Sequence, residues 1–68
     1  MFKLENYQNK VLLSVSEVAK ILNISRAFAY NLIKAGEIKS VHIRTSRRIR
    51  HEDLEMFIEK NTRPIEKN

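Results

Sequence analysis

The chain has 68 residues, with 13 basic and 8 acidic side chains, a single glycine and no cysteine. This length fits one domain with a small core, and the lack of cysteine excludes a disulfide bond or a thiolate metal site. No apolar run approaches the ~20 residues of a membrane span, and no signal peptide is recognisable. We therefore expect a cytoplasmic protein without a membrane partner.

The positive charge is concentrated in the middle of the chain. Residues 20–50 carry eight basic side chains and one acidic side chain, a net charge of +7, whereas the last eighteen residues sum to −2. A basic block in an otherwise balanced chain is typical of a surface that binds a polyanion, although a solvated surface without a partner can have the same composition. The distribution favours nucleic acid as the partner.

The first predicted element is a helix that begins at Ser14. Ser14 and Glu17 have the spacing of a capping box, in which each side chain accepts a backbone N–H of the other residue. Asn23 is expected to end the helix, because asparagine tolerates the left-handed conformation of a C-cap. Between them runs an apolar stripe at helical spacing. The stripe consists of Val15, Val18, Ala19 and Leu22.

A second helix is predicted almost immediately afterwards. Ser25 is a favourable N-cap, and Gly36 ends the helix. Its apolar stripe consists of Ala29, Leu32 and Ile33. Only Asn23 to Ser25 separate the two helices, so they must cross and pack directly, which is the geometry of a helix-turn-helix. Ile24, an apolar residue in this turn, is expected to be buried under the corner.

After Gly36 the apolar period changes from helical to alternating. Short runs around Val41, Ile43 and Ile49 predict two strands of a hairpin that turns at Thr45 and Ser46. Because this turn has no glycine, we expect a loop longer than two residues. A third helix is predicted from His51, with an acidic, solvated first turn at its positive end and an apolar face behind it. The acidic residues are Glu52, Asp53 and Glu55, and the apolar face is Leu54, Phe57 and Ile58.

The predicted fold class is α+β, mainly α: a winged helix-turn-helix with a two-stranded β-hairpin wing and a C-terminal helix. We place this domain at residues 11–60, between an N-terminal arm at 1–10 and a disordered tail at 61–68. One core can close the domain. Its predicted members are Val15, Val18, Ala19, Leu22, Ile24, Ala29, Leu32, Ile33, Ile38, Val41, Ile43, Ile49, Leu54, Phe57 and Ile58.

The second helix presents hydrogen-bonding and basic side chains opposite its apolar stripe, which suits a major groove. They are Arg26, Ala27, Tyr30, Asn31 and Lys34. Arginine can contact guanine with two hydrogen bonds and asparagine can do so with adenine, while a tyrosine hydroxyl can reach a phosphate. Ser25 and the helix N-terminus can hold a phosphate. Phe28 has two interpretations, contact with thymine methyl groups or sugars if exposed, and packing in the core if turned inward.

The predicted hairpin carries a cluster of positive charge around its tip. Arg44, Arg47 and Arg48 flank Thr45 and Ser46, and three guanidinium groups in one small loop repel each other unless a partner neutralises them. A wing that reaches a minor groove or a row of phosphates would supply that partner. The alternative is an edge hairpin that uses charge to prevent aggregation, which accounts for one arginine better than for three.

No pattern in the sequence supports catalysis or metal binding. His42 and His51 are the only histidines, and neither has cysteine or a third ligand at metal-like spacing. The single glycine excludes a glycine-rich phosphate loop, no serine lies in a nucleophile setting, and no carboxylate pair lies beside an apolar cleft. We therefore expect no enzyme, no cofactor and no small-molecule ligand.

The stretch from Leu12 to Lys60 resembles the excisionase-type, MerR-like winged helix-turn-helix domains. The most specific matches are Val18-Ala19, Ile24-Ser25-Arg26, Tyr30-Asn31-Leu32-Ile33, Gly36-Glu37-Ile38, and Arg50 followed by Glu52-Asp53-Leu54. The resemblance implies a recognition helix at Ser25–Ala35 and a wing at about Val41–Arg50. It implies base or phosphate contacts for Arg26 and Asn31, backbone contacts for Tyr30, and wing contacts for Arg47 and Arg48. Two residues replace a glycine that is usual in the family, Asn23 in the first turn and Arg44 near the wing tip.

Family members with little beyond this domain resemble recombination directionality factors of mobile elements. The resemblance implies double-stranded DNA as partner, bending of that DNA, neighbouring copies on it, and an integrase that is helped to excise the element. Others resemble small transcription regulators, and the fold supports either function. No effector domain or long dimerisation helix follows residue 60, so we do not expect a ligand-sensing activator. We favour the excisionase; a protein-binding adaptor is a third alternative, which the basic wing disfavours.

Overall fold

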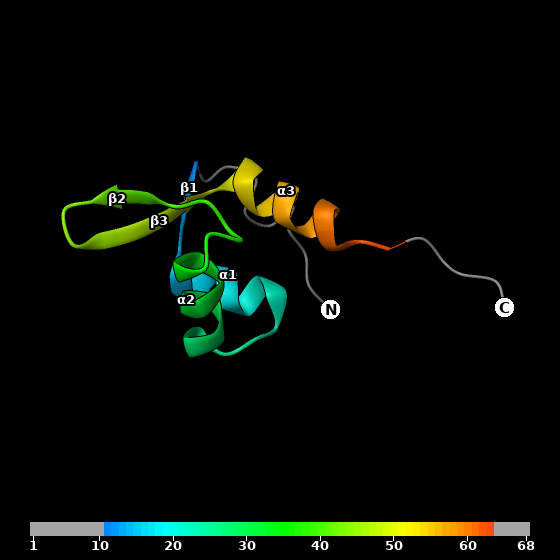
Figure 1. Cartoon of the computed structure of the whole chain (residues 1–68). Helices are drawn as coiled ribbons and strands as arrows, with labels where there is room; N and C mark the ends of the chain where they lie inside the picture. Colours follow the sequence, from blue (N-terminus) through cyan, green and yellow to red (C-terminus); the bar gives the residue numbers. More distant parts are fainter. Residues whose placement is uncertain (1–10, 64–68) are drawn as a thin grey trace, which may run out of the picture.

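The computed structural model describes residues 11–63. The predicted arm at 1–10 and residues 64–68 of the predicted tail lie outside the described residues. The elements in chain order are β1 (Leu12–Ser14), α1 (Val15–Leu22), α2 (Arg26–Lys34), β2 (Val41–Ile43), β3 (Ser46–Arg50) and α3 (His51–Asn61). In Figure 1 the β2–β3 hairpin extends away from α1 and α2, and α3 continues from the other end of β3. The predicted winged helix-turn-helix is confirmed.

The boundaries of α1 follow the predicted capping residues. The backbone N–H of Ser14 donates to Glu17 Oε1 at 2.9 Å, and the N–H of Glu17 donates to Ser14 Oγ at 3.1 Å. At the other end Asn23 adopts the left-handed conformation, with φ 59° and ψ 46°. The N–H of Ile24 then donates to the carbonyl of Ala19 at 2.9 Å, which closes the turn. The chain therefore leaves α1 in the direction that α2 requires.

The second helix is capped at its start and stopped by glycine at its end. Ser25 Oγ accepts a hydrogen bond of 3.0 Å from the backbone N–H of Phe28. Gly36 has φ +80°, a region that glycine adopts without steric cost, and its N–H donates to the carbonyl of Ile33 at 3.0 Å. Ile24 in the intervening turn is half-buried and packs against the core. These features give the predicted helix-turn-helix.

The wing belongs to a sheet of three strands rather than two. β3 is central, and it pairs antiparallel with β2 on one side and with β1 on the other. The hairpin was predicted, but β1 was not. Leu13 of β1 lies opposite Ile49 of β3, and both side chains are fully buried. The segment before the capping box thus ties the wing to the helices.

The turn between β2 and β3 contains only Arg44 and Thr45, so the prediction of a longer loop is wrong. Ile43 pairs with Ser46 directly across the turn. Arg44 itself takes the left-handed conformation, with φ 58°, which the two-residue turn needs and which glycine or asparagine usually supplies. The tight turn is therefore formed without the residue type on which the prediction depended.

The core differs from the predicted one at its edges. The buried apolar residues are Leu13, Val15, Val18, Ala19, Ile21, Ala29, Ile33, Ile38, Ile49 and Leu54. Leu22, Ile24, Leu32, Phe57 and Ile58 are half-buried and pack against this cluster. Leu13 and Ile21 were not predicted as core residues. Val41 and Ile43 were predicted as core residues, and this prediction is wrong. They lie opposite Arg48 and Ser46, on the face of the sheet away from Ile49, and Ile43 is 47% exposed.

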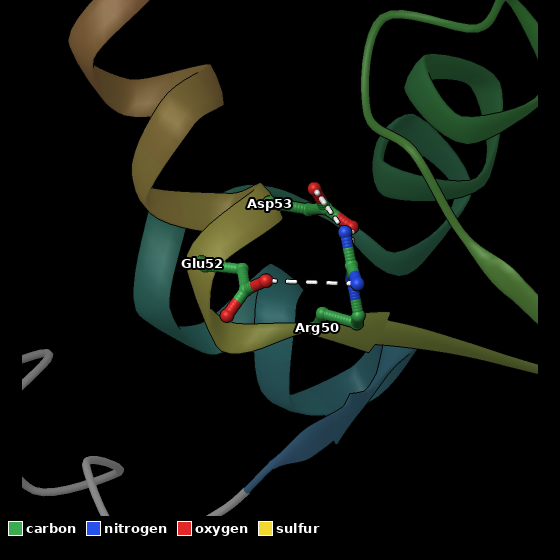
Figure 2. Close-up of polar contacts among 3 residues, drawn as sticks. All are labelled: Arg50, Glu52 and Asp53. Atoms are coloured by element: carbon green, nitrogen blue, oxygen red, sulfur yellow. Dashed lines mark hydrogen bonds and ion pairs between the residues drawn. The ribbon is translucent and has the colours of Figure 1, made fainter.

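The first turn of α3 is held by an ion pair that the sequence did not predict. Asp53 was expected to be solvated, but it is only 6% exposed. Arg50 Nε donates to Asp53 Oδ2 at 3.0 Å, and Arg50 Nη1 lies 3.6 Å from Glu52 Oε2, as Figure 2 shows. The hydrogen bond that Arg50 donates to Asp53, together with the negative charges of Asp53 and Glu52, raises the pKa of Arg50 above its ordinary value. Arg50 is therefore engaged within the fold.

Candidate nucleic-acid interface

The second helix separates a buried face from a polar exposed face, as its sequence period predicts. Ala29 and Ile33 are buried in the core, at 0% and 4% exposure. The predicted site residues on this helix are all exposed: Arg26, Ala27, Phe28, Tyr30, Asn31 and Lys34. Phe28 is 51% exposed and does not belong to the core, so the interpretation in which its ring packs inward is wrong, and its contact with DNA stays a prediction.

A cleft joins this helix to the wing. Its volume is about 160 Å³, and it lies where the first turn of α1, the exposed side of α2 and the β2–β3 turn meet. The residues that line it are Ser14, Val15, Ser16, Arg26, Tyr30, Thr45, Ser46, Arg47 and Arg48. None of these described lining residues is acidic, and three of them are arginines. Residues of α2 and of the wing that are distant in the sequence therefore share one basic concave surface.

One of the two wing arginines in this cleft makes a hydrogen bond within the hairpin. Arg47 and Arg48 are half-buried, and Arg48 Nη1 donates a 3.0 Å hydrogen bond to the backbone carbonyl of Arg47. An arginine has five N–H donors, so this bond leaves Arg48 able to donate further bonds to an anion. Arg44 is exposed at the tip and does not line the cleft.

Four of the predicted residues on α2 lie beyond the cleft. Ala27, Phe28, Asn31 and Lys34 are exposed but do not line it, whereas Arg26 and Tyr30 do. The exposed face of α2 thus has one side toward the wing and one side away from it. Ser25 precedes both, and its Oγ already accepts the N–H of Phe28, so its hydroxyl is available to a ligand mainly as a donor.

The start of α1 was missing from the predicted site. Ser14 and Ser16 line the cleft, which brings the capped start of α1 to the same place as the three arginines. The capping box located this helix end in the sequence. Its position beside the wing depends on the pairing of β1 with β3, in which Ser14 lies opposite Arg48. No sequence pattern indicated that pairing.

A second cleft, of about 210 Å³, lies between the segment after α2 and α3. Its lining residues are Gly36, Glu37, Lys39, Asp53, Met56, Phe57 and Lys60, a mixture of both charges and apolar side chains. Among residues 11–63 no group of three or more histidine, cysteine or acidic side chains could hold a metal ion. Within the same residues, no helix has the length and apolar character needed to cross a membrane.

Comparison with known proteins agrees with this architecture. The model of a family described as a helix-turn-helix domain matches residues 12–62. A protein of Saccharopolyspora erythraea named "Probable excisionase" is 51% identical over 41 residues, which cover 60% of this chain and 42% of that protein. The match thus spans less than half of the relative's length. No solved structure matches significantly. The chain belongs to the helix-turn-helix domain family, with the winged form of that fold.

Proposed function

We propose that this protein binds duplex DNA in a sequence-dependent manner, with α2 in the major groove and the β2–β3 hairpin against the neighbouring backbone. The observation that carries the proposal is the cleft in which Arg26, Arg47 and Arg48 come together beside the start of α1. A DNA phosphate is the ligand with the charge and the acceptor oxygens that such a surface suits. Neutralising phosphates also releases counterions, which drives association.

The exposed side chains fall into two groups by what they can recognise. Arg26 and Asn31 can form paired hydrogen bonds to guanine and adenine, respectively, and are proposed to read bases. Backbone contacts are proposed for the remaining polar and basic residues of the interface, which hold the protein on the duplex without reading its sequence. They are Ser25, Tyr30, Lys34, Arg44, Ser46, Arg47 and Arg48. Ala27 is small enough to let α2 approach the bases closely.

Within DNA binding, we favour the role of an excisionase, or recombination directionality factor, which bends DNA and helps an integrase to excise a mobile element. The name of the Saccharopolyspora erythraea relative supports this role. A second argument is the small size of the reading surface. One recognition helix and one wing cover too few base pairs for genomic specificity, and several copies on neighbouring sites would make up the deficit.

The arrangement of bound sites tests this role against that of a small transcription regulator. The full chain would be sedimented alone at micromolar concentration and then footprinted on the attachment region of the element that encodes it. An excisionase is expected to be a monomer in solution that fills direct repeats cooperatively and bends the DNA. A stable free dimer that fills an inverted repeat in one step would indicate a regulator instead, because a two-fold dimer matches a palindrome. In that case the proposal of DNA binding would stand.

A further inference from the structure

Phe28 is the large apolar residue of α2 that the core does not use. Its side chain is 51% exposed, while Ala29 and Ile33 on the same helix are buried. A single exposed apolar residue is ordinary on a protein surface, so the exposure alone indicates nothing. The position is more informative. The backbone N–H of Phe28 is bound by Ser25 Oγ, which fixes the residue in the first turn of α2.

The first turn of a recognition helix is the part that approaches base edges in helix-turn-helix proteins. On α2, Arg26 and Tyr30 lie one turn apart and line the cleft toward the wing. Phe28 and Asn31 are also one turn apart, and neither lines that cleft. Phe28 therefore lies with Asn31 on the side of α2 that the wing does not cover.

A phenyl ring has neither donor nor acceptor, so it cannot read the hydrogen-bonding edges of the bases. The apolar group that the major groove offers is the C5-methyl of thymine. We propose that Phe28 is a specificity-determining residue that contacts a thymine methyl group, beside the base contacted by Asn31. This inference rests on the proposed binding of duplex DNA and adds an apolar contact to it.

The test uses the full chain and the tightest duplex that it selects from a randomised pool. Each thymine of that duplex is replaced in turn by deoxyuridine, which removes only the methyl group. At one or two thymines the affinity is expected to fall roughly three- to five-fold, the loss that corresponds to one buried methyl-sized group. Deoxyuridine at the other positions should leave the affinity unchanged.

Protein variants then assign the effect to a residue. Phe28→Ala lacks the ring that contacts the methyl group, so it should bind the thymine and deoxyuridine duplexes equally at the sensitive position. The removal of the ring and the removal of the methyl group together form a double-mutant cycle. Met56→Ala is the matched control, because Met56 is 61% exposed on α3, and it should keep the full preference for thymine. Far-ultraviolet circular dichroism of each variant checks that the fold is retained.

The outcomes separate this inference from the proposed function. If the chain selects a duplex but no thymine is sensitive, or if Phe28→Ala keeps the preference for thymine, the inference is overturned and DNA binding stands. If the chain selects no duplex from the pool, the proposed function itself fails. Loss of the thymine preference in Phe28→Ala alone supports the inference.

Discussion

Arg44 shows at the scale of one residue how a tight turn is made from an unfavourable side chain. It occupies the first of the two turn positions between β2 and β3, with φ 58°. For a residue with a Cβ atom, this backbone conformation costs about 1–2 kcal/mol, whereas glycine adopts it without steric cost. The positive side chain is therefore kept at the wing tip at a cost in folding free energy.

Replacing Arg44 by glycine should raise the free energy of unfolding. The strain that is relieved is larger than the entropic cost of the more flexible unfolded chain. We expect the free energy of unfolding, measured by urea denaturation, to rise by about 0.5–1 kcal/mol. Arg44→Ala is the control, because it removes the same charge but keeps the Cβ atom, and it should give no such gain. Equal stability of the two variants would show that the turn stores no strain at Arg44.

Arg50 and Asp53 form an ion pair in which the charge of the arginine stabilises the fold. Arg50→Ala leaves the carboxylate of Asp53, 6% exposed, without its paired donors, so the variant should unfold at lower urea concentration. Arg50→Lys keeps the charge but loses the bidentate geometry, so its stability in urea should lie between those of the unmodified protein and Arg50→Ala. Because the pKa of Arg50 is raised, its stabilisation persists below the ordinary arginine pKa and is lost only in strong alkali.

The control for this pair is Glu52→Ala. Glu52 contacts the same guanidinium at 3.6 Å, but its side chain is 69% exposed, and exposed ion pairs contribute little. A loss as large as that of Arg50→Ala would mean that total charge rather than the buried carboxylate matters.

Among the residues that the structure describes, two other than glycine have a left-handed backbone, and the sequence predicts one of them and not the other. The conformation of Asn23 could be predicted, because asparagine tolerates φ 59° better than most residues and it follows an apolar helical stripe. That of Arg44 could not, because arginine has no such preference and the tertiary pairing of β2 with β3 imposes it. The burial of Asp53 could not be predicted either, because it depends on an ion pair with Arg50, and the sequence offers Arg50 equally as a member of the basic block.

At the level of the elements, β1 is short but contributes a fully buried residue to the core. It has three residues, and Leu13 at its centre is fully buried opposite Ile49. Three residues are too few to establish an alternating pattern, and the last of them, Ser14, indicated the start of a helix. Alternation was also misleading in β2, because Val41 and Ile43 do alternate with polar residues but face away from the core.

Leu13→Ala should therefore destabilise the whole domain. Removing a fully buried leucine side chain costs about 2–5 kcal/mol, comparable to the total stability of so small a domain. We expect most of the variant to be unfolded at 37 °C, as measured by circular dichroism and urea titration. Leu12→Ala changes the adjacent residue, which is half-buried on the opposite face, and should cost much less. Similar losses in both would argue against a structural role for the β1–β3 pairing.

For the whole molecule, the arrangement of three separate elements around one cleft is the feature most relevant to function. Helix periodicity was enough to predict the exposed face of α2, and composition was enough to predict a basic wing. Neither could show that Arg26 shares a cleft with Arg47 and Arg48, or that Ser16 joins them, because this depends on the three-stranded sheet. The proposed interface is thus a tertiary property of the fold.

The salt dependence of duplex binding tests whether the cleft between α2 and the wing binds DNA. If the cleft binds phosphates, the logarithm of the association constant should fall linearly with the logarithm of salt concentration, with a slope of about −0.9 per phosphate neutralised. Arg47→Ala/Arg48→Ala should flatten that slope, by up to about 1.8 if each arginine neutralises one phosphate. Lys39→Ala/Lys60→Ala removes the same charge from the second cleft and should leave the slope near that of the unmodified protein. Equal slopes in the two double variants would contradict the assignment of the cleft as the DNA-binding surface.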